Sequence, residues 1–216
     1  MNGMNKNHKT PFEASFIAQT LWADLSPIDW LVCACWKKNL MMHPAAWLVP
    51  CNIANLAGIW NENLSLNDDG EYFCRIILAS KGVKFCTVAK SYYRSGNLTS
   101  LSSLKSYEGF KSAFSSVELC SNNLLAHENS SYTRYAAACA WQYFVFMAYP
   151  QAKDLVKYAE KNIRLLGGCD LSPDGGFMFR IICEIFGWKN AKRLQTLLFK
   201  KGHYKIVLSR LFNSLN

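Results

Sequence analysis

The stretch Leu66-Asn-Asp-Asp-Gly-Glu-Tyr-Phe-Cys-Arg75 decides how the chain is interpreted, because it places two acidic residues directly before a predicted helix. Good helix formers fill residues 71–80, apolar residues gather on one side of them, and Gly82 follows. Carboxylates at the start of a helix are stabilised by free backbone N–H groups and by the helix dipole. Asp68 and Asp69 are therefore predicted to lie in a loop that ends at a helix N-terminus.

This acidic pair has two interpretations. In the structural one, the pair forms a helix N-cap with a charged neighbour, which adjacent acids often do. In the chemical one, two neighbouring carboxylates push their pKa values apart, and one of them accepts a proton from a hydroxyl group as a general base. The two acids alone do not distinguish these interpretations, so the surrounding sequence must be considered.

Secondary structure on either side of this stretch divides the chain near residue 103. On the N-terminal side, Ser26-Pro27 can start a helix at Ile28, residues 52–57 form a short helix, and residues 83–89 are predicted as a strand. On the C-terminal side, helical periodicity dominates and Pro and Gly separate the segments. The predicted helices there are 104–127, 131–149, 152–166, 176–186, 189–201 and 204–215.

The composition predicts a folded protein with a basic surface. Half of the 216 residues are hydrophobic and 18% are charged, so the chain can bury a core. A net charge of +9 attracts phosphate groups on nucleic acids, anionic lipids or nucleotide-linked substrates. The basic residues are spread along the chain without zinc-finger spacing or an aromatic RNA-binding signature, so we expect no nucleic-acid partner.

Cysteine usage and hydropathy indicate the compartment. The nine cysteines are irregularly spaced, most lie in apolar runs, and none forms a Cys-x-x-Cys pair, which predicts free, buried thiols in a reducing cytoplasm. We find no signal peptide and no apolar run of about 18 residues, so no transmembrane helix is expected. The expected location is cytoplasmic, with peripheral membrane contact as an addition.

The motifs around the acidic pair carry a family resemblance. They are Gly58-Ile-Trp-Asn-Glu62, the pair itself, Glu71-Tyr-Phe-Cys-Arg75 and Tyr93-Arg94. In this order and spacing, residues 43–94 resemble the C-terminal half of a family 2 glycosyltransferase of the GT-A type. The resemblance implies an α/β fold class, with a partial GT-A core in residues 1–103 that carries the acceptor side and the catalytic-base loop. A mainly α-helical C-terminal region, residues 104–216, would follow it.

The resemblance also implies an activity and roles for single residues. The activity is sugar transfer from a nucleotide-sugar donor to a glycan or lipid-linked acceptor, in the synthesis of surface polysaccharide. Asp69 matches the catalytic base that deprotonates the acceptor hydroxyl, and Asp68 would hold the acceptor or Asp69. The remaining substrate-binding candidates are Trp47 and Trp60 for sugar rings, Arg94 for the donor diphosphate and His43 for the acceptor. Each of these residues also has a purely structural interpretation. The tryptophans can pack in the core, the arginine can be a solvated loop residue, and the histidine can be structural.

The chain also departs from the family pattern. Cys51 stands where many relatives have arginine, and Ser95-Gly96 stand where a histidine is common. No Asp-x-Asp motif occurs, and the residues before His43 are too few for a nucleotide-binding half. We therefore expect the chain to lack that half and to hold no cofactor itself, while the complete enzyme uses a divalent metal, Mn or Mg.

These departures leave alternatives open. The chain can be a non-catalytic remnant, or the partner-binding or membrane-binding subunit of a split glycosyltransferase. The expected partners are a missing N-terminal half or a second copy of the chain. Between Phe199 and Phe212, four Lys and Arg residues accompany apolar ones, which is typical of a peripheral membrane helix and equally of a basic helix packed on its own domain.

Overall fold

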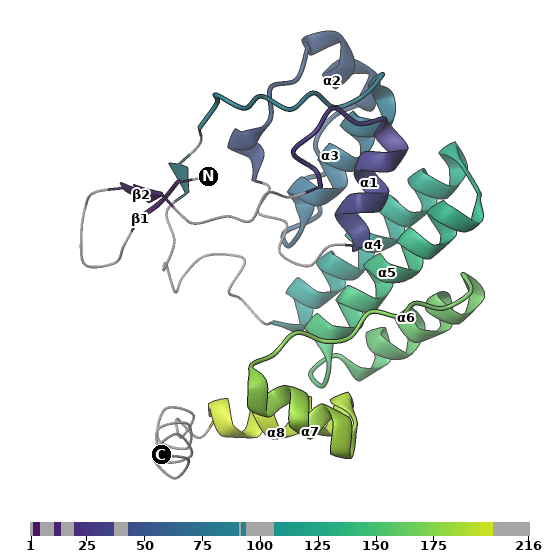
Figure 1. The fold of residues 1–216 in the computed structure, drawn as a ribbon. Coiled ribbons are helices and arrows are strands. Elements are labelled where there is room, and N and C mark those ends of the chain that lie inside the picture. The colour runs from purple at the N-terminus through teal and green to yellow at the C-terminus, as the bar shows by residue number, and fades with distance from the viewer. Residues whose placement is uncertain are drawn as a thin grey trace.

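The computed structural model describes residues 2–4, 11–13, 20–36, 43–90, 92–93 and 106–200, and this part of the chain is mainly helical (Figure 1). In chain order the elements are β1 (Asn2–Met4), β2 (Pro11–Glu13), α1 (Pro27–Trp36), the 3-10 helix η1 (Pro44–Ala46), α2 (Cys51–Ala57), α3 (Asp68–Ala79), β3 (Tyr92–Tyr93), α4 (Tyr107–His127), α5 (Ser131–Ala148), α6 (Lys153–Leu165), α7 (Phe177–Phe186) and α8 (Trp188–Lys200).

The predicted α/β fold class, with its partial GT-A core, is wrong. The strands of the described residues are two or three residues long, and their order in the sheet is β2-β1-β3. Strand β1 pairs antiparallel with β2 and parallel with β3. Strands this short cannot form the layer on which the helices of an α/β core pack. Helix packs on helix instead.

The predicted strand at residues 83–89 shows why the pattern misled. Val83 makes a single bridge to Leu25, in which the two residues exchange backbone hydrogen bonds of 3.0 and 2.9 Å. Phe85 stacks on Trp22 with ring centroids 5.8 Å apart, and Val88 is 84% exposed. The alternation of apolar residues therefore reflects separate local contacts and not one face of a sheet.

The predicted helices are confirmed wherever the structure describes them, and their ends lie within three residues of the predicted ones. Local signals explain this agreement. Ser106 caps α4 by accepting from the Gly109 N–H, and Ser130 and Thr133 form a capping box at the start of α5. The helix predicted at 204–215 lies outside the described residues, as does most of the basic segment Phe199–Phe212.

Helix α5 lies at the centre of the described fold, between α1, α4 and α6 (Figure 1). Its run Ala136-Ala-Ala-Cys139 is fully buried, because small side chains let neighbouring helices approach closely. One core cluster joins α4, α5 and α6 around Phe110 and Phe144. The other joins α1 and α3 to α4 and α5 around Val32 and Ile77. The second cluster therefore joins helices from both sides of residue 103.

Two buried serines of α4 fix the start of α3. The Ser112 hydroxyl accepts hydrogen bonds from the backbone N–H groups of Ser65 and Leu66, at 2.7 and 2.9 Å. One helical turn later, the Ser116 hydroxyl accepts from Asn67 Nδ2 and donates to the Asn67 carbonyl, both at 2.7 Å. Asn67, the N-cap of α3, has a left-handed φ of 63°. This unusual backbone conformation is stabilised by bonds from another helix.

We predict that Ser116→Ala destabilises the fold by about 1 kcal/mol, because it removes the partner of the Asn67 side-chain amide and one of the two donors to the Asn67 carbonyl, which also accepts from the Glu71 N–H at 3.3 Å. Urea unfolding measures the change. Ser115→Ala alters the neighbouring, partly exposed serine and should stay within about 0.5 kcal/mol of the parent. Equal effects of the two substitutions would contradict this role for Ser116.

Candidate functional site

The acidic pair lies inside a helix and not in the loop before it. Helix α3 begins at Asp68, with Asn67 as its N-cap, so both carboxylates belong to the first turn. Both side chains are partly buried. The positive end of the helix dipole favours negative charge there, as expected. What the sequence did not indicate is how differently the two carboxylates are surrounded.

Asp69 has an environment that favours its protonated form. Burial raises the pKa of Asp69 above the ordinary aspartate value, and the negative charge of Asp68 raises it further. The Gly70 N–H, which donates to Asp69 Oδ1 at 2.8 Å, and the nearby His43 lower this pKa and offset part of the rise. A carboxylate with a raised pKa holds a proton more strongly, which improves it as a general base.

Asp68 is held in place by Trp60. The Trp60 indole donates through Nε1 to Asp68 Oδ2 at 3.2 Å. The same ring packs on Tyr72, with centroids 4.6 Å apart. This indole therefore links the Gly58-Ile-Trp60 turn to the first turn of α3. It fixes the carboxylate of Asp68 and does not bond to that of Asp69.

An aromatic cluster surrounds this end of α3. Trp47 stacks on Phe73 with ring centroids 5.1 Å apart and planes 15° apart, and it meets Trp30 edge-on at 5.1 Å. One face of the Trp47 ring is therefore packed against Phe73, as the alternative of core packing expects. His43, the N-cap of η1, lies close enough to feel the charge of Asp69, although burial lowers the pKa of His43.

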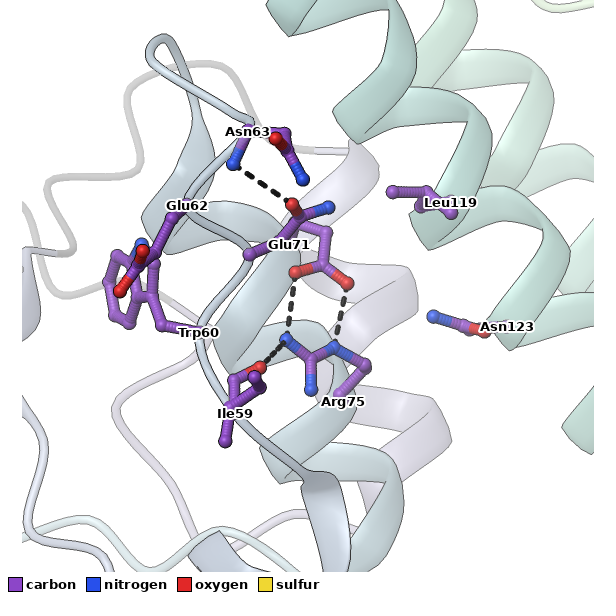
Figure 2. Close-up of a pocket in the computed structure, with 9 residues that line it drawn as sticks. Ile59, Trp60, Glu62, Asn63, Glu71, Arg75, Leu119 and Asn123 are labelled. Carbon is purple, nitrogen blue, oxygen red and sulfur yellow. Dashed lines mark hydrogen bonds and ion pairs between the residues drawn. The ribbon is translucent and has the colours of Figure 1, made fainter.

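A buried ion pair positions the turn that carries Trp60 (Figure 2). The Arg75 guanidinium donates to both Glu71 oxygens, at 2.7 and 3.0 Å, and Glu71 is only 3% exposed. Arg75 also donates to the carbonyls of Ala57 and Ile59, which flank Gly58. Gly58 has φ 82°, a conformation that side chains disfavour, so a glycine is required between the two bound carbonyls.

A pocket of about 590 Å³ opens beside this ion pair. Figure 2 shows the Glu71–Arg75 pair between the loop and two α4 residues, Leu119 and Asn123. The loop supplies Ile59, Trp60, Asn61, Glu62 and Asn63. Amides, a carboxylate and an indole at one opening suit a ligand rich in hydroxyl groups. Asp69 does not line the pocket, and Trp60 is the residue common to the pocket and the acidic pair.

Five of the six predicted site residues lie near one another in the structure. The sixth, Arg94, is outside the described part of the chain. The five are His43, Trp47, Trp60, Asp68 and Asp69. The sequence did not predict that Glu71 and Arg75 would hold the Trp60 turn. Nor did it predict that Ser112 and Ser116 would hold the segment 65–67. The four-residue spacing within each pair was the available signal, because it puts both members on one helix face.

No protein-family model, curated protein or solved structure matches the chain. Among the described residues, no group of three or more His, Cys, Asp or Glu side chains is arranged to hold a metal ion. No helix in the described ranges has the length and apolar character that crossing a membrane requires.

We predict that Asp69→Asn stabilises the fold near neutral pH. A carboxyl whose pKa is raised on folding contributes stability below its unfolded pKa, and this contribution is lost as the pH rises through the folded pKa. Asparagine carries no charge and still offers an oxygen to the Gly70 N–H. The variant should therefore exceed the parent in free energy of unfolding near pH 7, and the difference should vanish at about pH 3.

Urea unfolding at both pH values measures this difference. Asp170→Asn, which alters an exposed aspartate in the loop after α6, is the matched control and should change little at either pH. A variant of Asp69 that is less stable than the parent near neutral pH would show that the charged carboxylate is favoured by the fold.

Proposed function

We propose that this chain provides the acceptor-side catalytic groups of sugar transfer from a nucleotide-linked donor, with Asp69 as the general base. The observation that carries the proposal is a partly buried carboxylate of raised pKa, placed beside a second carboxylate that an indole N–H holds in position. The resemblance of residues 43–94 to family 2 glycosyltransferases supports it independently.

The proposed chemistry is a single displacement. Asp69 accepts the proton of an acceptor hydroxyl as the hydroxyl oxygen forms a bond to the anomeric carbon of the donor sugar. The bond from that carbon to the diphosphate oxygen breaks, and the nucleoside diphosphate leaves with the electron pair. General-base assistance of this kind contributes about 10²–10⁴-fold to rate. Asp68 acts as a positioning residue, because its carboxylate is already bound to Trp60.

The proposed acceptor is a glycan or a lipid-linked sugar. Its hydroxyl groups match the amides of Asn61, Asn63 and Asn123 in the pocket of Figure 2. Trp60, which lines the pocket and contacts Asp68, connects the pocket to the acidic pair. An acceptor longer than one sugar unit can therefore place one unit in the pocket and present the next hydroxyl to Asp69.

Donor binding requires more cations than the described residues supply here. A diphosphate is bound by a metal or by several convergent positive groups, whereas no group of three or more His, Cys, Asp or Glu side chains in the described ranges is arranged to hold a metal ion. We propose that a second polypeptide binds the donor, with Arg94 as this chain's contribution to the diphosphate.

A second candidate function is binding without chemistry. Three aliphatic side chains next to the site are exposed to an unusual extent: Leu48 by 98%, Ile59 by 91% and Leu56 by 73%. Apolar surface of this kind is typical of a protein contact. In the catalytic proposal it contacts the donor-binding polypeptide. In the second candidate, the same surface makes this chain a glycan-binding subunit.

The catalytic proposal predicts that Asp69→Asn lowers transfer by about 10²–10⁴-fold, because the amide keeps the size of the side chain but accepts no proton. The assay follows release of nucleoside diphosphate from a panel of nucleotide-sugars, with the chain alone and mixed with separately produced donor-binding polypeptides. Asp170→Asn should retain parental turnover. Parental turnover in Asp69→Asn would remove Asp69 from the base role.

Acceptor binding separates the two candidate functions. Calorimetry with oligosaccharides should show that Asp69→Asn binds as the parent does, while Trp60→Ala loses affinity by about tenfold or more. Binding that depends on Trp60, combined with no transfer in any mixture, would favour the non-catalytic subunit. Absence of glycan binding in every combination would contradict both candidates.

A further inference from the structure

The structure brings two cysteines from different elements into direct contact. Cys139 lies in the buried middle of α5, and Cys169 lies in the segment that follows α6. Their sulfur atoms are 3.1 Å apart, although 30 residues separate them in the chain. A disulfide bond length is about 2.05 Å, so the two sulfurs lie about 1 Å beyond bonding distance. We propose that Cys139 and Cys169 form a reversible intramolecular disulfide under oxidising conditions.

The backbone on the Cys169 side is built for this contact. Gly167 and Gly168 have φ values of 104° and 93°, which turn the chain back toward α5 directly before Cys169. The Leu171 N–H donates to Cys169 Sγ at 3.4 Å. These local contacts fix the thiol against Cys139, so closing the remaining gap requires only a small shift of a surface segment.

Helix α5 holds this segment by a second contact. Arg134, which precedes Cys139 on α5, donates to the Leu165 carbonyl at 2.8 Å. The end of α6 is therefore tied to α5 independently of the two sulfurs. A bridge between Cys139 and Cys169 would make this attachment covalent without changing which elements pack together.

The two cysteines have different roles in the reaction. Cys169 is partly exposed, whereas Cys139 is fully buried and burial raises the pKa of its thiol. A peroxide therefore meets Cys169 first. Its sulfur bonds to one peroxide oxygen, the O–O bond breaks and one water leaves, which gives a sulfenic acid. The Cys139 sulfur then bonds to the Cys169 sulfur, the S–O bond breaks and the second water carries away the last thiol proton.

Overall, two thiols are oxidised to one disulfide and one peroxide molecule is reduced to two waters. Disulfides in reducing compartments are typically transient and redox-sensing, and dithiol reductants reverse them by exchange. The bridge closes a loop between α5 and the segment after α6, which restricts the unfolded chain. From loop-closure entropy and the size of the chain, the oxidised form should melt about 5–10 °C higher than the reduced form.

Mass spectrometry of the full chain tests the proposal. The reduced chain is treated with hydrogen peroxide, its remaining thiols are alkylated, and it is digested with trypsin without reduction. Cys139 and Cys169 are the single cysteines of the tryptic peptides 135–153 and 165–180. We expect these two peptides to appear joined before any other cysteine pair, at equal yield on dilution of the protein, and to separate on addition of a dithiol.

Two variants provide the controls. Cys169→Ser, at the partly exposed partner, should lose both the joined peptide and the rise in melting temperature. Cys183→Ser, at another partly buried cysteine, should keep both. Oxidation of Cys169 to sulfinic or sulfonic acid while Cys139 remains alkylatable would overturn the proposal. So would a Cys169-linked dimer as the first product.

Discussion

The buried ion pair between Glu71 and Arg75 is the interaction on which the candidate site depends. Glu71 is nearly inaccessible to solvent, and a buried carboxylate is tolerable only when it is paired and fully hydrogen-bonded. Arg75 meets this requirement with two hydrogen bonds and uses two further donors on the carbonyls of Ala57 and Ile59. The pair therefore attaches the turn around Gly58 to α3 and determines where Trp60 lies.

This attachment affects the acidic pair, and a second set of contacts supports the site from the other side. The Trp60 indole reaches Asp68 only because the turn is held, so the acidic pair becomes one fixed carboxylate and one carboxylate with a raised pKa. The start of α3 is held from the other side by Ser112 and Ser116 of α4. The helical region beyond residue 103 is consequently part of the support of the site and not a separate appendage.

The sequence predicted what local interactions determine. Helix limits were predicted from helical periodicity and from the glycine and proline that separate the segments, whereas His43 and the two tryptophans were named as site residues through the family resemblance. The predicted fold class was wrong because it was inferred from the resemblance and from the apolar residues of segment 83–89. One of these residues, Val88, is exposed and does not pack in a core. The serine contacts join residues 46–49 positions apart, and no local pattern specifies such a pairing.

Several polar groups around Asp69 already form hydrogen bonds within the protein. The Asp68 carboxylate, Asn67 and the Gly70 N–H each have a partner. Burial is the largest cause of the raised pKa of Asp69, and the charge of Asp68 adds to it.

The central claim is therefore that burial raises the pKa of Asp69 in the folded chain, and the most direct measurement is an NMR titration of its carboxyl carbon. The same titration of the chain unfolded in urea supplies the reference. We expect the Asp69 carboxyl to titrate at a higher pH in the folded chain than in the unfolded chain. Titration of Asp69 in the folded chain at the same pH as in the unfolded chain, or at a lower one, would contradict this claim.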